Sequence, residues 1–180
     1  MTSIKQQLFD ATREGRVEEV GALLRDNSEL NVNSGDEDGW TALHYASRFD
    51  HVGVIQLLLA HPAINVNVQD HFGRTPLLFG CLNGHGSAVR VLLKDHRVDV
   101  TLTDFTGHTP LWWASGYGGI ELVEWLLASG RDLGDLNTKR KVYTVLEIAR
   151  KDNTPEVSAL LEKFIAHPTL TRHELRLKLG

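Results

Sequence analysis

The sequence predicts an all-α fold, a solenoid of stacked helix–turn–helix units from which β-turns project. The first observation is a motif with aspartate, glycine and threonine in identical places, which reads DEDGWTALHYA from Asp36, DHFGRTPLLFG from Asp70 and DFTGHTPLWWA from Asp104. Its copies begin 34 residues apart. The second observation is a leucine pair that recurs at intervals of 35, 34, 34 and 34 residues, at Leu23-Leu24, Leu58-Leu59, Leu92-Leu93, Leu126-Leu127 and Leu160-Leu161. Two markers that keep one period over five units indicate a repeat array.

Each unit has a pattern that predicts a turn followed by two helices. The D-x-x-G-x-T segment is typical of a turn, because glycine adopts positive φ without strain and aspartate accepts backbone N–H groups. A first short helix begins near the threonine, and Pro76 and Pro110 stand in its first turn, where a missing N–H costs nothing. After a break, apolar residues at helical spacing predict a second helix. Since no such pair buries its apolar face alone, the units must stack.

We expect five units, in order, within a repeat domain of residues 1–167. The first is degenerate, because LFDA (Leu8 to Ala11) stands in place of the motif and Gln6-Gln7 replace threonine and proline. The central three carry the motif in full. The last keeps Thr144 and Ala149 but has Val142 in place of the turn glycine, and one extra residue shifts its register. The expected intervals are about 4–35, 36–69, 70–103, 104–138 and 139–167.

The strings TALHYA, TPLLFG and TPLWWA resemble the ankyrin repeat, in which T-P-L-H-x-A recurs with a period near 33 residues. The resemblance covers about residues 4–165 and is most specific in the three central units. It implies an ankyrin-repeat solenoid whose degenerate end units act as caps.

The last segment, residues 168–180, differs from the repeats. Pro168 ends the preceding helix, and Thr171 with Glu174 matches a capping box. However, Leu175, Leu177 and Leu179 alternate with charged residues, which is the period of a strand. We expect this tail to fold over the last unit as a cap; the alternative is a peptide that docks elsewhere.

Composition excludes several classes of protein. The net charge of −4 argues against a nucleic-acid binder, although residues 1–138 carry 18 acidic and 10 basic side chains and residues 139–180 carry 5 and 9. No apolar run matches a secretory signal or a membrane span. The single cysteine, Cys81, cannot form an internal disulfide. We therefore expect a soluble, cytoplasmic protein without membrane contact, with the nucleus as the alternative location.

The glycine-rich stretch GHTPLWWASGYGG follows the repeat and is no phosphate loop. Gly107 holds the turn position and Gly118 the break between helices, and neither the strand nor the lysine of a phosphate loop is present. We expect Trp112 and Trp113 to pack between units, with an indole N–H that reaches a polar partner.

No pattern of catalytic or metal-binding residues occurs. The nine histidines show no H-E-x-x-H spacing, there is no C-x-x-C, and His44 is the ordinary histidine of T-x-L-H. Cys81 lies in a tight helix where a buried, unreactive thiol is expected. The basic cluster Lys139, Arg140 and Lys141 falls in the exposed turn of the last unit. We predict no enzyme activity, no cofactor and no metal.

The resemblance implies that turn tips and the exposed side of the first helices form a concave groove that binds another protein. Transferred by repeat position, the groove consists of Glu37, Asp38, Trp40, Arg48, Phe49, His71, Phe72, Arg74, Leu82, Asn83, Phe105, Thr106, His108, Tyr117, Arg140, Lys141, Tyr143, Lys151 and Asp152. Six of these residues are aromatic and of the types that form binding hot spots: Trp40, Phe49, Phe72, Phe105, Tyr117 and Tyr143. We expect two of the six to fold down against neighbouring turns. Acidic residues 36–38 and basic residues at the far end would orient a ligand.

These observations predict a non-catalytic protein–protein interaction module, an adaptor with aromatic anchors in mid-groove. Two alternatives remain: a regulator that inhibits a partner enzyme by steric blocking, and a self-assembling scaffold. We expect a monomer, with weak head-to-tail self-association as the alternative.

Overall fold

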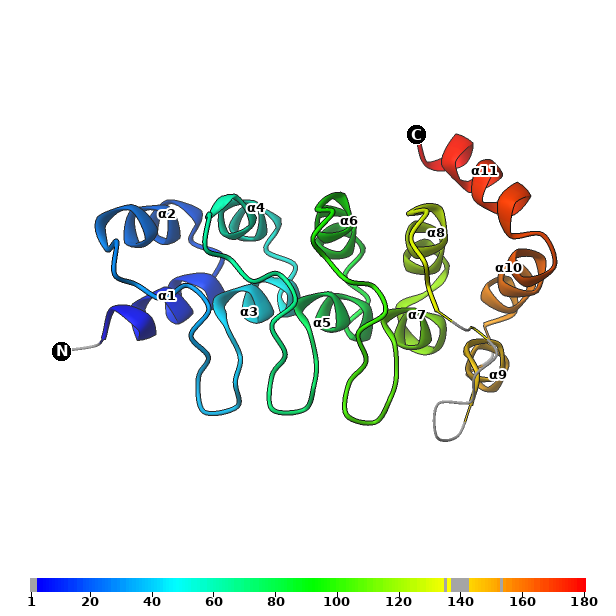
Figure 1. Cartoon of the computed structure of the whole chain (residues 1–180), viewed down its shortest axis with the longest axis horizontal. Coiled ribbons are helices and arrows are strands. Elements are labelled where there is room, and N and C mark those ends of the chain that lie inside the picture. The colour runs from blue at the N-terminus through cyan, green and yellow to red at the C-terminus, as the bar shows by residue number, and fades with distance from the viewer. Residues whose placement is uncertain (1–2, 135, 137–142, 153) are drawn as a thin grey trace.

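The computed structural model describes residues 3–134, 136, 143–152 and 154–180. Within them, consecutive helices pair side by side, and the pairs stack along one direction (Figure 1). First helices form one row and second helices another, and long turns project beyond the first row. The pairs are α1 (Ile4–Arg13) with α2 (Val17–Asp26), α3 (Ala42–Arg48) with α4 (Val52–Ala60), α5 (Pro76–Leu82) with α6 (Gly86–Lys94), α7 (Pro110–Trp113) with α8 (Ile120–Ala128), and α9 (Val145–Lys151) with α10 (Pro155–Ala166). A final helix, α11, spans Pro168–Leu179.

This architecture confirms the predicted all-α stack of helix–turn–helix units. Each of the five expected intervals contains one helix pair. The boundaries between intervals stay a prediction. One local feature departs from the repeat: α7 continues directly into a π-helical turn, η1 (Ala114–Gly118), so the first helix of the fourth pair ends in a wider turn than its neighbours.

Threonines fix the start of the first helices. Thr75 and Thr109 adopt extended φ and ψ angles, and their hydroxyls accept the backbone N–H groups of Leu78 at 3.3 Å and Trp112 at 3.2 Å. Thr144 forms a full capping box with Glu147, whose carboxylate accepts the Thr144 N–H at 2.8 Å. These caps matter because helices of seven residues or fewer are not stable by propensity alone.

One apolar core runs through the array. The leucines at the third motif position (Leu43, Leu77 and Leu111) are almost completely buried, as are Leu58, Leu92 and Leu126 of the second helices. Small residues let the two rows approach: a side chain at Gly80 would collide with Val89 of α6, 2.8 Å away. Every unit therefore depends on its neighbours for burial.

Polar contacts also join consecutive units. Backbone N–H groups donate from His71 to Asp38 O at 3.0 Å and from Phe105 to Phe72 O at 2.9 Å, so the turns that begin at Asp36, Asp70 and Asp104 are bonded one to the next. The Nε2 atoms of His51 and His85 lie 2.9 and 2.8 Å from the carbonyl oxygens of Arg13 and Arg48 in the preceding unit. The stacking direction is thus fixed by hydrogen bonds as well as by the core.

The C-terminal segment is a helix, which corrects the predicted strand period. Leu175 is buried and Leu179, one turn later, is partly buried, whereas Leu177 is 73% exposed. A helix explains this division better than alternation does, because positions 175 and 179 share a face. The predicted capping box of Thr171 and Glu174 is wrong: Thr171 is not the N-cap of α11 but lies inside it, and its hydroxyl donates to Lys163 O at 3.3 Å.

α11 folds back against α10 and α8 (Figure 1). Arg172 and Arg176 donate to the carbonyl oxygens of Leu127 at 3.2 Å and Ala128 at 3.0 Å, which lie at the C-terminal end of α8. Lys178 forms an ion pair of 2.5 Å with the buried Glu124. The two arginine contacts satisfy carbonyls that a helix end leaves without intrahelical partners. That α11 serves as the cap of the array stays a prediction.

Candidate protein-binding surface

Three aspartates build the projecting turns. One carboxylate oxygen of Asp36, Asp70 and Asp104 accepts two backbone N–H groups each, two and four residues ahead, at 2.8–3.0 Å. The glycine three residues after each aspartate has φ between 77° and 85°, a region that favours glycine. The predicted turn chemistry is confirmed, and it gives these aspartates a structural role.

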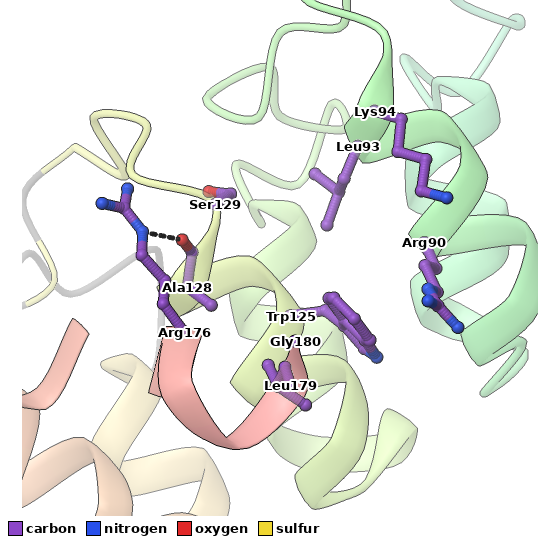
Figure 2. Close-up of a pocket in the computed structure, with 9 residues that line it drawn as sticks. All are labelled: Arg90, Leu93, Lys94, Trp125, Ala128, Ser129, Arg176, Leu179 and Gly180. Atoms are coloured by element: carbon purple, nitrogen blue, oxygen red, sulfur yellow. Dashed lines mark hydrogen bonds between the residues drawn. The ribbon is translucent and has the colours of Figure 1, made fainter. Parts of the chain in front are cut away.

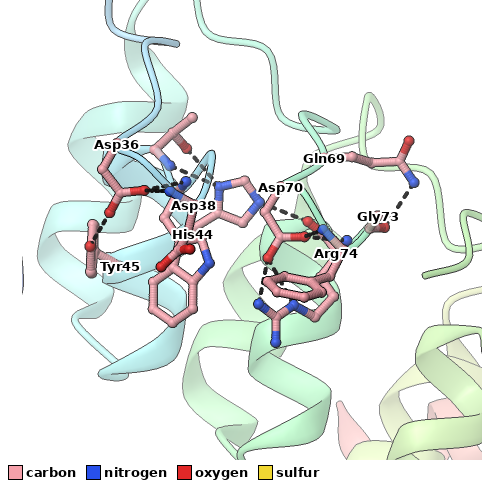
Figure 3. A network of polar contacts seen from close by, with 11 residues as sticks. Asp36, Asp38, His44, Tyr45, Gln69, Asp70, Gly73 and Arg74 are labelled. Atoms are coloured by element: carbon pink, nitrogen blue, oxygen red, sulfur yellow. Dashed lines mark hydrogen bonds and ion pairs between the residues drawn. The ribbon is translucent and has the colours of Figure 1, made fainter. Parts of the chain in front are cut away.

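The second carboxylate oxygen has a different donor in each turn. Tyr45 donates to Asp36, and the guanidinium of Arg74 pairs with Asp70 at 2.7 Å (Figure 3). The indole N–H of Trp113 donates to Asp104 at 2.9 Å. Burial raises the pKa of Asp36, but hydrogen bonds from Tyr45 and from backbone N–H groups outweigh it, and the pKa lies below its ordinary value. Asp36 is therefore part of the frame, and Glu37 and Asp38 supply the exposed negative charge of this turn.

His44 joins two turns from inside the array (Figure 3). Its Nδ1 accepts the Thr41 N–H at 3.0 Å, and its Nε2 lies 2.9 Å from Arg74 O of the next unit. Burial lowers the pKa of His44 to about 4, against the opposing effect of its hydrogen bond to Arg74. A neutral imidazole that donates from Nε2 satisfies both contacts.

Four of the six predicted groove aromatics are exposed. Phe72 and Phe105 on the turn tips are 56% and 69% exposed, and Phe49 and Tyr117 at the ends of first helices are 44% and 56% exposed. Trp40 and Tyr143 are partly buried against the core. Two of six fold down, as expected from the sequence. We call the surface of turn tips and first-helix ends the turn face; it contains Glu37, Asp38, Phe49, His71, Phe72, Asn83, Phe105, Thr106 and Tyr117.

Arginines connect the exposed rings through Trp40. Arg48 lies 5.1 Å from the Trp40 ring and 5.8 Å from Phe49, and Arg74 lies 5.5 Å from Trp40 and 4.7 Å from Phe72. Phe49 and Phe72 therefore belong to one continuous aromatic–arginine cluster that spans two units. Each such contact contributes about 0.5–1 kcal/mol at an exposed site and holds the guanidinium in place.

The second group of rings lies farther along the array. The Phe105 ring packs over Gly73 of the preceding turn, where a Cβ would lie 2.6 Å from it. Tyr117 contacts Trp113 with ring centroids 5.5 Å apart, and His108 stacks on Trp112 at 3.7 Å. His108 is thus half-buried, and its predicted part in partner binding stays a prediction.

The other predicted residues divide into three groups. His71, Asn83 and Thr106 are exposed on the turn face, although Asn83 and Thr106 also bond locally to Phe79 O and the Asp104 carboxylate. Leu82 and Asp152 are half-buried, and exposed Lys151 lies 4.9 Å from the Tyr143 ring. Arg140 and Lys141, with Lys139, lie outside the described residues.

The residues that were predicted to pack inside the array are buried or partly buried. Trp112 is buried and its indole donates to Tyr143 O at 3.0 Å, while Trp113 is partly buried. Cys81 is fully buried, and burial raises the pKa of its thiol. Among the described residues, no group of three or more His, Cys, Asp or Glu side chains could hold a metal ion, and no helix there is long and apolar enough to cross a membrane.

The family model described as ankyrin repeats (3 copies) matches residues 5–70 and 63–140, which is more than half of the chain. This chain belongs to the ankyrin repeat family. A search among curated proteins found no match. The ankyrin match ends before α9, so the last helix pair and α11 lie outside it. Ankyrin repeats are generally protein–protein interaction modules and typically non-catalytic.

Two features of this ankyrin array are not predicted by the sequence analysis. The first is the set of contacts between Arg48 or Arg74 and the aromatic rings, because repeat position predicts where an arginine lies but not which ring it contacts. The second is the π-helical turn at Ala114–Gly118, for which GYGG, with its three glycines at the end of a short helix, is a usable signal.

Proposed function

We propose that this ankyrin protein is a non-catalytic adaptor that binds another protein on its turn face, within the concave groove that the family resemblance implies. The observation that carries the proposal is the set of four exposed aromatic rings: Phe49, Phe72, Phe105 and Tyr117. None of these four rings belongs to the apolar core of the array. Exposed aromatic rings are frequent hot spots of protein binding when arginine accompanies them.

The rings are already held in place before a partner arrives. Phe72 lies under Arg74, which is itself fixed by its ion pair with Asp70, and Phe105 rests on the Gly73 turn. Side chains that are ordered in advance lose less conformational entropy on binding. We therefore expect these two turn-tip rings to contribute most of the affinity.

Charge supports a fixed orientation of the partner. Glu37 and Asp38 give the first projecting turn a negative tip, and in the described residues Lys151 places a positive charge near the other end. Such an arrangement acts on association rate and register more than on affinity.

The test is a comparison of two variants, each of which removes two exposed apolar side chains. We expect Phe72→Ala/Phe105→Ala to lower partner affinity at least about tenfold. The control is Leu170→Ala/Leu177→Ala, which removes two exposed leucines from α11 and should leave binding unchanged. Circular dichroism and thermal unfolding establish that both variants fold. Equal binding by both variants would refute the proposal.

An inhibitor of a partner enzyme would bind through the same turn face as an adaptor. The two functions differ only in whether binding lowers the activity of the partner. If the partner is an enzyme, its activity measured with and without the ankyrin protein separates an inhibitor from an adaptor.

Head-to-tail self-assembly has less support than a monomeric adaptor. Several basic side chains near the C-terminus are paired internally: Arg150 with Glu162, Lys163 with Glu174 and Lys178 with Glu124. They are less free to attract the acidic turn of another copy. A mass that rises with concentration and falls with salt would nevertheless support self-assembly.

A further inference from the structure

A pocket lies among the second helices, away from the turn face. It has a volume of about 250 Å³ and is lined by α6, α8 with the residue after it, and α11 with Gly180 (Figure 2). α11 completes the pocket, because Arg176 and Leu179 close the side that α6 and α8 leave open. None of the lining residues belongs to the turn face, so this site is independent of the proposed adaptor function.

The pocket is largely apolar. Leu93 lines it on one side, and Trp125 and Leu179 line it on the other (Figure 2). Trp125 is unusual within the repeat, since its equivalents in the preceding second helices are Val91 and Leu57. The larger ring extends the apolar surface toward α11 and is only partly buried. Sites of this kind bind the apolar part of a small ligand.

Positive charge surrounds the apolar surface. Arg90 and Lys94 stand at one end of the pocket and Arg176 at the other (Figure 2). Within the described part of the chain, none of the three forms an ion pair, and none of the nine lining residues has an acidic side chain. Arg90 lies 4.8 Å from the Trp125 ring, and Arg176 is held by Ala128 O. Glu121 lines a separate depression, which shares Arg90 and Lys94 with this pocket.

We propose that this pocket binds a small amphiphilic carboxylate, an aryl or short acyl group that carries one carboxylate. The apolar part lies against Leu93, Trp125 and Leu179, and the carboxylate faces Arg90 and Lys94. A polar anion would leave the apolar lining uncovered, and a neutral apolar molecule would gain nothing from the two cations. The combination selects for a ligand that has both parts.

The experiment follows the indole N–H resonances of the four tryptophans by NMR during titration with octanoate. Trp125→Phe identifies the Trp125 signal. We expect this signal to shift and saturate, while those of Trp40, Trp112 and Trp113, which lie away from the pocket, stay in place. Octan-1-ol and butyrate each lack one recognised part and should bind at least about tenfold more weakly. No shift at Trp125, or equal binding of octanol and octanoate, would overturn the proposal.

Matched variants test the charges and the apolar lining. Lys94→Gln should weaken octanoate binding about tenfold, because one charge-assisted contact is lost. Arg25→Gln changes the equivalent cation of α2 and should have no effect. Leu179→Asp puts a carboxylate into the pocket and should abolish binding, whereas Leu177→Asp on the exposed face of α11 should not. Unchanged affinity in Lys94→Gln and Leu179→Asp would show that octanoate binds elsewhere and refute the site.

Discussion

At the scale of single residues, equivalent positions of the repeat make equivalent contacts. Asp36, Asp70 and Asp104 bind their own turns in the same way. The sequence predicted this because an aspartate that recurs beside a turn glycine has one physical explanation. It did not predict the side chain that meets each second oxygen, because that partner depends on the packing of one particular unit.

His44 makes stability depend on pH. Its pKa is about 4 in the folded protein and near 6.5 when unfolded, so the unfolded chain binds more protons between these values. The contribution of neutral His44 to the unfolding free energy is fully present above about pH 6.5. It is lost as pH falls toward 4, and the loss amounts to about 3 kcal/mol at most.

Urea unfolding at pH 7 and pH 4.5 tests whether His44 lowers the stability of the protein as pH falls. The difference in unfolding free energy between the two values should be smaller in His44→Gln than in the parent protein. His173→Gln, which changes an exposed histidine of α11, is the control and should keep the parent's difference. An equal difference in His44→Gln would mean that this histidine is not the group responsible.

At the scale of elements, the helix pairs were predictable and α11 was not. Two periodic markers located ten helices by their spacing, because each unit repeats the same burial pattern. The tail has no second copy for comparison, and its alternating leucines are compatible with a strand on local grounds alone. Its helical state depends on tertiary contacts: Leu175 is buried, and Arg172 and Arg176 bind the end of α8.

A pair of leucine variants tests whether α11 is an integral part of the array. Leu175→Ala should lower the unfolding free energy by about 2–3 kcal/mol and raise hydrogen exchange in α11, because it removes a buried anchor. Leu177→Ala should change stability by less than about 0.5 kcal/mol, because that side chain is exposed. If the two variants unfold alike, α11 is not held by Leu175.

At the scale of the whole molecule, the array presents two surfaces with different chemistry. The turn face carries exposed rings, two of which contact arginines, and the second-helix side carries the cationic, apolar pocket closed by α11. The sequence located the first surface, since repeat position alone predicts which residues lie on turns. The pocket was not predicted, because it requires Leu93, Trp125 and Leu179 from distant segments to meet.

The central claim is that a protein partner contacts the turn face. The most direct measurement places a photo-crosslinking phenylalanine analogue at Phe105 in one preparation and at Leu177 of α11 in another, and compares the proteins captured after illumination. The account predicts a partner crosslinked from position 105 and not from position 177. Capture of the same partner from position 177 alone would contradict it.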